Sequence, residues 1–234
     1  MHRRAARMHI FYLHGFMSSP ASSKAAFLAD RFRRHRLTLH CPDLNEPDFS
    51  TVTTTRMVAQ VETAIAAMAP DAVTLIGSSL GAFVALHVAE RAAIGRARSE
   101  RPIERLVLLA PALDFGRHRL GDIDDAGMAR WRDSGWLELT HHAYGEVCRV
   151  HYELYTDAHR YDSFAAKCGA PMLVLQGNQD AVVDPETVAR FAAPRPHVRM
   201  VRLDDDHQLT GSLERVWSET ASFLGLVADG RDAD

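Results

Sequence analysis

A serine at the centre of a glycine-rich pentapeptide is the residue of this chain best placed to act as a nucleophile. Gly77-Ser78-Ser79-Leu80-Gly81 has the pattern G-x-S-x-G and lies between a short β-branched run and an apolar helical run. A strand-to-helix turn of this kind is strained and lifts the hydroxyl of its middle residue clear of the backbone. Gly77 and Gly81 lack Cβ atoms, so the strand and the helix can cross closely. The pattern predicts Ser79 as a nucleophile; the alternative is a Gly/Ser-rich loop without catalytic function.

An attacking serine needs a base, and the base needs a group that orients it. His207 lies after the last predicted strand and before the terminal helix, and it is the candidate base. Asp180 follows the preceding strand and is the candidate acid, with Asp114, one strand earlier, as its rival. Asp184 precedes a proline and has the position of a helix N-cap. For His207 the alternative is a surface histidine in an acidic loop.

A third group of residues follows the first predicted strand. An H-G-x sequence in this position, here His14-Gly15-Phe16, supplies half of an oxyanion hole in many hydrolases. The backbone N–H groups of Phe16 and Leu80 would then stabilise a developing oxyanion together. Gly15 permits the turn, and we expect His14 to brace the loop by hydrogen bonds rather than to take part in the reaction.

The remaining motifs and the composition narrow the function classes. The other histidines have no metal-binding spacing, and no G-x-G-x-x-G or P-loop motif is present, so we predict no metal, dinucleotide or ATP cofactor. A balance of 27 basic and 30 acidic residues implies no attraction to nucleic acids or membranes. Cys41, Cys148 and Cys168 have no paired spacing, which favours reduced thiols and a cytoplasmic protein. Asp204–Asp206 is predicted to be a solvated turn.

The elements that must position these residues alternate between short apolar strands and amphipathic helices, which is typical of a parallel sheet with helices on both faces. The predicted strands are His9–Leu13, Leu37–Cys41, Ala72–Ile76, Arg105–Leu109, Met172–Gln176 and Val198–Leu203. The predicted helices are Ser23–Arg33, Thr55–Met68, Ala82–Ile94, Pro185–Ala192 and Ser212–Leu226. Right-handed crossovers give a doubly wound α/β sheet of about six strands, with all the candidate side chains at its carboxyl edge.

One segment breaks the alternation. Residues 112–168 contain no convincing core strand and carry six tryptophans and tyrosines, so we predict a helical lid over the carboxyl edge. Most of these aromatic residues are expected to pack the lid onto the body, and several to face a pocket. We expect one domain over residues 1–234, with a disordered tail at Asp229–Asp234. Met1–Arg7 is expected to be either a disordered arm or a misassigned start before Met8.

Several segments together resemble the YqiA-like esterases, a bacterial branch of the α/β-hydrolase superfamily. The resemblance is carried by Tyr12 to Pro20, Ser23-Lys24-Ala25, Cys41 to Leu44, Gly77 to Gly81 and Phe223 to Leu226. It implies an α/β-hydrolase fold, with Ser79 as nucleophile, Asp180 as acid and His207 as base. The chain departs from the family in having Ala82 where a glycine is usual, and Asp205 and Asp206 in place of a glycine pair.

These observations predict a serine hydrolase that cleaves a small acyl ester or thioester through an acyl-enzyme, without a cofactor. An acyltransferase or a C–C bond hydrolase would use the same three residues. A non-enzymatic ligand-binding protein on the same fold is the remaining alternative.

Overall fold

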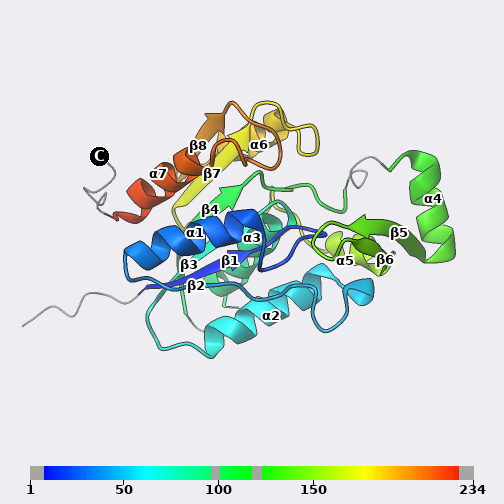
Figure 1. Cartoon of the computed structure of the whole chain (residues 1–234), viewed down its shortest axis with the longest axis horizontal. Coiled ribbons are helices and arrows are strands. Elements are labelled where there is room, and N and C mark those ends of the chain that lie inside the picture. The colour runs from blue at the N-terminus through cyan, green and yellow to red at the C-terminus, as the bar shows by residue number, and fades with distance from the viewer. Residues whose placement is uncertain (1–7, 96–100, 118–122, 227–234) are drawn as a thin grey trace, which may run out of the picture.

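A six-stranded parallel sheet forms the centre of the molecule. The computed structural model describes residues 8–95, 101–117 and 123–226, so the predicted disordered ends lie outside the described residues. The strand order is β2-β1-β3-β4-β7-β8. The strands are β1 (Met8–Leu13), β2 (Leu39–His40), β3 (Ala72–Ser78), β4 (Ile103–Leu109), β7 (Met172–Gly177) and β8 (Val198–Leu203). The predicted doubly wound α/β fold is confirmed (Figure 1).

Helices cover both faces of this sheet. They are α1 (Ser23–Arg34), α2 (Thr54–Ala66), α3 (Leu80–Ala93), α6 (Pro185–Ala192) and α7 (Leu213–Leu224). Alternate residues of β1 enter different cores: Phe11 and Leu13 join residues of α2, α3 and α6, whereas Ile10 and Tyr12 join residues of α1 and α7. A strand buried on both faces has no polar side, which explains why the central strands β3 and β7 are nearly continuous buried runs in the sequence.

Polar caps set the helix starts near the carboxyl edge of the sheet. Asp184 accepts hydrogen bonds from the N–H groups of Glu186 and Thr187, both at 3.1 Å, with Pro185 in the first turn. The predicted N-cap role of Asp184 is therefore confirmed. Ser22 caps α1 in the same way, through the N–H of Ala25.

The insertion between β4 and β7 differs from the predicted helical lid. It contains α4 (Asp125–Ser134) and α5 (Glu153–Ala158), but also an antiparallel hairpin of β5 (Trp136–His141) and β6 (Glu146–His151). In β5, Leu137, Leu139 and His141 are less exposed than the residues that alternate with them. This period of two marks a strand with one solvated face, which a search for continuous apolar runs does not detect.

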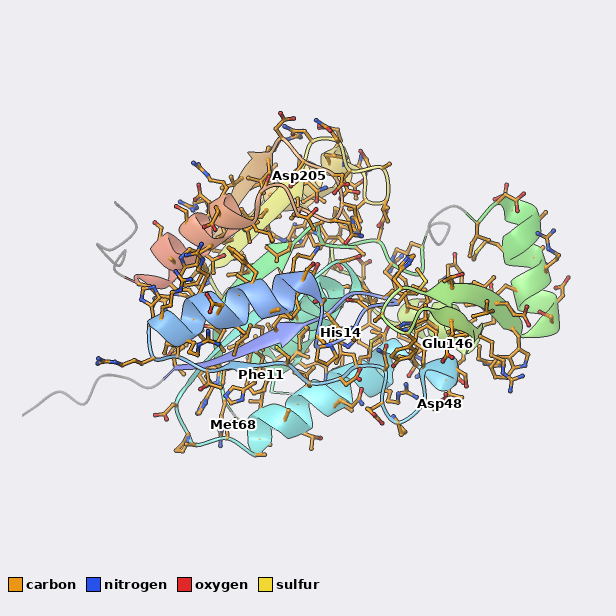
Figure 2. The ribbon with its side chains drawn as sticks, viewed as in Figure 1. Phe11, His14, Asp48, Met68, Glu146 and Asp205 are labelled. Carbon is orange, nitrogen blue, oxygen red and sulfur yellow. The ribbon has the colours of Figure 1, made fainter. Side chains whose placement is uncertain are left out.

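The insertion lies beyond the ends of the strands, with α4 as its outermost element (Figure 1). It is joined to α2 by Asp157, whose carboxylate accepts hydrogen bonds from the N–H and hydroxyl of Thr55, each at 2.7 Å. Its hairpin packs on the 3₁₀ helix η1 (Phe49–Thr51), where Glu146 lies close to Asp48 (Figure 2). Trp131 is buried and donates to the carbonyl of Val150 at 3.0 Å.

Candidate active site

The turn between β3 and α3 holds Ser79 in a strained conformation. Its φ angle is +54°, in the left-handed region that residues other than glycine rarely adopt. The turn is held in place because the N–H of Ser79 donates to the carbonyl of Leu109 at 2.9 Å. A Cβ atom at Gly77 would clash with the backbone of Gly81, and one at Gly81 would clash with the backbone of Leu13. Both glycines are therefore required for the close crossing that the sequence predicted.

The structure brings Ser79, His207 and Asp180 into one hydrogen-bonded row. The Nε2 atom of His207 lies 3.0 Å from the Ser79 Oγ, and its Nδ1 atom lies 2.8 Å from Oδ2 of Asp180. The three residues follow β3, β7 and β8, so they come from separate parts of the chain and meet at the carboxyl edge. Asp114 also borders the cavity beside Ser79, but the imidazole is bonded to Asp180.

Asp180 is buried in a loop that satisfies its carboxylate. Oδ1 accepts hydrogen bonds from the N–H groups of Val182 at 2.9 Å and Val183 at 2.8 Å, and Oδ2 accepts one from Gln176 at 2.8 Å. Burial by itself would raise the pKa of Asp180, but the hydrogen bonds from His207, Val183 and Gln176 lower it below its ordinary value. The carboxylate is thus held ionised beside the imidazole that it orients.

The loop after β1 approaches the serine turn closely. A Cβ atom at Gly15 would lie 3.3 Å from the Ser78 carbonyl and 3.4 Å from the Ser79 Cβ, so the loop has little room for a larger residue. Phe16 and Leu80 border the same cavity as Ser79. Leu80 is the first residue of α3, where backbone N–H groups have no partner within the helix and attract negative charge. The oxyanion hole of Phe16 and Leu80 stays a prediction, with both residues at the cavity that contains Ser79.

His14 makes its contacts with neighbouring loops. Its Nδ1 lies 2.9 Å from the Gly15 carbonyl, and its Nε2 accepts a hydrogen bond from the N–H of Leu44 at 3.0 Å and lies 3.2 Å from Asp43. Burial lowers the pKa of His14, which favours a neutral ring that donates from Nδ1 and accepts at Nε2. These contacts agree with the predicted bracing role of this side chain at the end of β1 (Figure 2).

A cavity of about 910 Å³ opens at Ser79 and His207, and both apolar and polar residues line it. The insertion and the loop that holds Asp180 contribute the apolar Leu137, Leu139, Tyr155 and Val182, together with the polar Glu138 and His142. The loop after β1 and the start of α1 contribute the polar Ser18, Ser19, Ser22, Ser23 and Lys24, together with the apolar Phe16, Met17 and Ala21. A cavity of this size and mixed lining is typical of small-molecule sites.

Sequence reasoning missed most of these lining residues. Of the six tryptophans and tyrosines of the insertion, Tyr155 borders the cavity, and Tyr144 borders a smaller surface pocket. Phe115, also in the insertion, lines the cavity as well. The two-residue alternation of Leu137 and Leu139 was the available signal for a cavity-facing strand. Lys24 was visible as one of two lysines in the chain, but its burial was not predictable from its neighbours.

Two absences hold for the part of the chain that the structure describes. Within residues 8–95, 101–117 and 123–226, no group of three His, Cys, Asp or Glu side chains has the arrangement of a metal site. Over the same residues, no helix has both the length and the apolar character to cross a membrane. Cys41, Cys148 and Cys168 are free thiols in the structure.

Structural comparisons place this arrangement on a known fold. A protein from Agrobacterium vitis S4 is 21% identical, with a TM-score of 0.72, 92% of this chain and 87% of that chain covered. Est1E from Butyrivibrio proteoclasticus, in a structure with ferulic acid bound, is 18% identical, with a TM-score of 0.72 and coverage of 93% and 87%. Mouse alpha/beta hydrolase domain-containing protein 10 is 18% identical, with a TM-score of 0.70 and coverage of 94% and 90%. The fold is that of the α/β hydrolases.

Sequence comparisons identify the family. The profile of the "Uncharacterised protein family (UPF0227)", the YqiA-like family, matches residues 9–224. No protein in the curated set matches the chain. The chain belongs to the YqiA-like family, as its resemblance predicted.

Proposed function

We propose that this member of the YqiA-like family is a serine hydrolase that cleaves a small carboxylic ester or thioester. The observation that supports the proposal most directly is the row of contacts from Ser79 through His207 to Asp180, with distances of 3.0 and 2.8 Å. A nucleophile within hydrogen-bond reach of a base, and a base oriented by a third group, are the requirements for covalent catalysis by serine.

In the proposed reaction, His207 takes the proton of Ser79 as the Oγ atom attacks the carbonyl carbon. The carbonyl oxygen becomes an oxyanion and accepts hydrogen bonds from the backbone N–H groups of Phe16 and Leu80. The tetrahedral intermediate collapses, the bond to the leaving group breaks, and the imidazolium of His207 protonates the leaving alcohol or thiol. Water then attacks the acyl-serine with His207 as base, which releases the acid and restores Ser79. Asp180 stays ionised throughout and stabilises the imidazolium.

The cavity supports a substrate with an apolar acyl group. Leu137, Leu139 and Tyr155 line the same cavity as Ser79, and a chain or ring placed against them removes apolar surface from water. The binding of ferulic acid by Est1E supports an acyl or aryl ester as the first substrate class to test.

The test is labelling by a fluorophosphonate, followed by hydrolysis of p-nitrophenyl esters of increasing acyl length. We expect stoichiometric labelling that is lost in Ser79→Ala and retained in Ser78→Ala, together with ester hydrolysis. Labelling without hydrolysis, but with transfer to an added alcohol or amine, would favour the acyltransferase alternative. No labelling at all would favour a ligand-binding protein.

A further inference from the structure

A buried lysine lies beside the proposed base and has no part in the reaction described above. Lys24, in the first turn of α1, has 8% of its surface exposed, and this remainder borders the cavity that contains Ser79 and His207. Its Nζ donates a hydrogen bond of 2.6 Å to the backbone carbonyl of Gln208, the residue after His207. The contact links two segments that are 184 residues apart in the sequence.

The ammonium group has no paired carboxylate. Among the described residues, no carboxylate oxygen lies within the 4.0 Å of an ion pair with Lys24. Burial accordingly lowers the pKa of Lys24 from 10.5 to about 8, although the charges of Asp206, Asp205 and Asp180 oppose this shift. A buried charge without a partner costs free energy of folding, so Lys24 is a poor choice for stability alone.

The residues that precede and contact His207 carry negative charge. Asp205 and Asp206 come directly before His207, and Asp180 is bonded to it. Figure 2 shows Asp205 on the loop after β8. Negative charge favours the protonated imidazolium, which cannot accept the Ser79 proton. The ammonium of Lys24 is bonded to Gln208, the next residue of the loop. Its positive charge opposes this effect, and the bond also fixes the path of the loop.

We propose that Lys24 is a positioning residue of the catalytic centre, which holds the His207 loop through the Gln208 carbonyl and offsets the negative charge around the imidazole. This inference rests on the proposed serine hydrolase function. The ammonium itself bonds to backbone, so its effect on the reaction passes through His207.

The first test is Lys24→Met, which keeps the length of the side chain and removes the charge. On an uncharged ester such as p-nitrophenyl acetate, we expect kcat to fall on the order of 10- to 100-fold at neutral pH, as for a slightly misplaced base, with little change in KM. The midpoint of the pH–rate curve should move to higher pH. Tm should stay the same or rise, because a buried charge is removed.

Two matched variants separate charge from packing. Lys24→Arg keeps the positive charge, so its pH–rate midpoint should stay near that of the wild type. Lys167→Met removes the other lysine of the chain, which is exposed, and should leave both kcat and the midpoint unchanged. A parallel fall of Tm and activity in Lys24→Met, with no shift of the midpoint, would reduce Lys24 to a structural contact and overturn the proposal.

A measurement without turnover keeps this inference separate from the proposed function. The imidazole signal of His207, assigned by its loss in His207→Gln, can be titrated by NMR in the wild type and in Lys24→Met. We expect the titration midpoint to be higher in the variant. An unchanged midpoint would overturn the role of Lys24 even in an active esterase, whereas an inactive, unlabelled wild type would refute the esterase function alone. A loss confined to esters that carry a carboxylate would make Lys24 a substrate-binding residue instead.

Discussion

The carboxyl edge of the sheet and the insertion meet at one cavity, but they are built in different ways. At the edge, Ser79, Asp180 and His207 each follow a strand of the six-stranded sheet, and hydrogen bonds join them. The insertion lines the cavity with Leu137 and Leu139, among others, and supplies none of the proposed catalytic residues. On the proposed function, the sheet positions the reacting groups, and the insertion would select the substrates that reach them.

The contacts that hold the two regions differ as well. The edge loops are fixed by hydrogen bonds, such as those from the backbone N–H groups of Val182 and Val183 to the carboxylate of Asp180. The hairpin of the insertion contacts the body through side-chain packing, in which the ring of Phe49 lies edge-on to His141 at 4.6 Å, and through a backbone hydrogen bond of 3.3 Å from the Ala143 N–H to the Met17 carbonyl. Changes at the edge should therefore affect kcat, and changes in the insertion should affect substrate preference and stability.

The largest effect is expected at the serine. Ser79→Ala removes the attacking oxygen and should lower kcat on the order of 10⁶-fold, as in other serine triads. Steady-state hydrolysis of a p-nitrophenyl ester measures this loss, and circular dichroism should show an unchanged fold. Ser78→Ala, which changes the last residue of β3, should keep most of the activity. If Ser78→Ala is the inactive variant, the proposed nucleophile is wrong.

The second largest loss of kcat is expected at Asp180, the proposed acid. Asp180→Asn keeps the shape but stabilises the wrong tautomer of His207, and kcat should fall on the order of 10⁴-fold. Asp114→Asn, at the rival position, should change kcat far less, because the imidazole is bonded to Asp180. An inactive Asp114→Asn beside a near-normal Asp180→Asn would assign the acid to the loop after β4.

The sequence predicted the two regions unequally, for physical reasons. The central strands β3 and β7 are apolar runs with a turn at their ends, and β8 follows in the same α/β alternation, so the edge positions of Ser79, Asp180 and His207 could be predicted from topology. The hairpin of the insertion has one solvated face, and its alternating residues lack the continuous apolar run that marks a buried strand. The burial of Lys24 depends on a contact 184 residues away, which no local pattern encodes.

A smaller effect on activity is expected at Leu137 and Leu139, which line the cavity. Truncation of Leu137 and Leu139 to alanine removes surface that an acyl chain would contact, worth about 1–3 kcal/mol in a hydrophobic pocket. The kcat/KM for long p-nitrophenyl esters should fall at least tenfold relative to that for the acetate, and fluorophosphonate labelling of Ser79 should persist. Val147→Ala is the control, because Val147 is 68% exposed on the neighbouring strand. An equal loss for short and long esters would contradict a role of the insertion in selection.

The smallest effect concerns the acid stability of the insertion. His141 is buried between Phe49 and Tyr144, and neither of its ring nitrogens has a hydrogen-bond partner among the described residues. Burial, followed by the charges of His14 and His142, lowers the pKa of His141 below its ordinary value of 6.5.

Because the pKa of His141 is lowered in the folded protein, acid should destabilise the fold. The unfolded chain binds a proton at position 141 more readily than the folded protein does, so the stability that a neutral His141 permits is present above pH 6.5 and is lost as the pH falls below it. His141→Phe cannot be protonated and still packs against the aromatic rings, so its Tm should fall by a few degrees less than that of the wild type between pH 7 and pH 5. His142→Phe, at the exposed next position, should behave like the wild type. Thermal unfolding at both pH values measures the difference, and identical losses of Tm in His141→Phe and the wild type would show that the hairpin does not depend on a neutral His141.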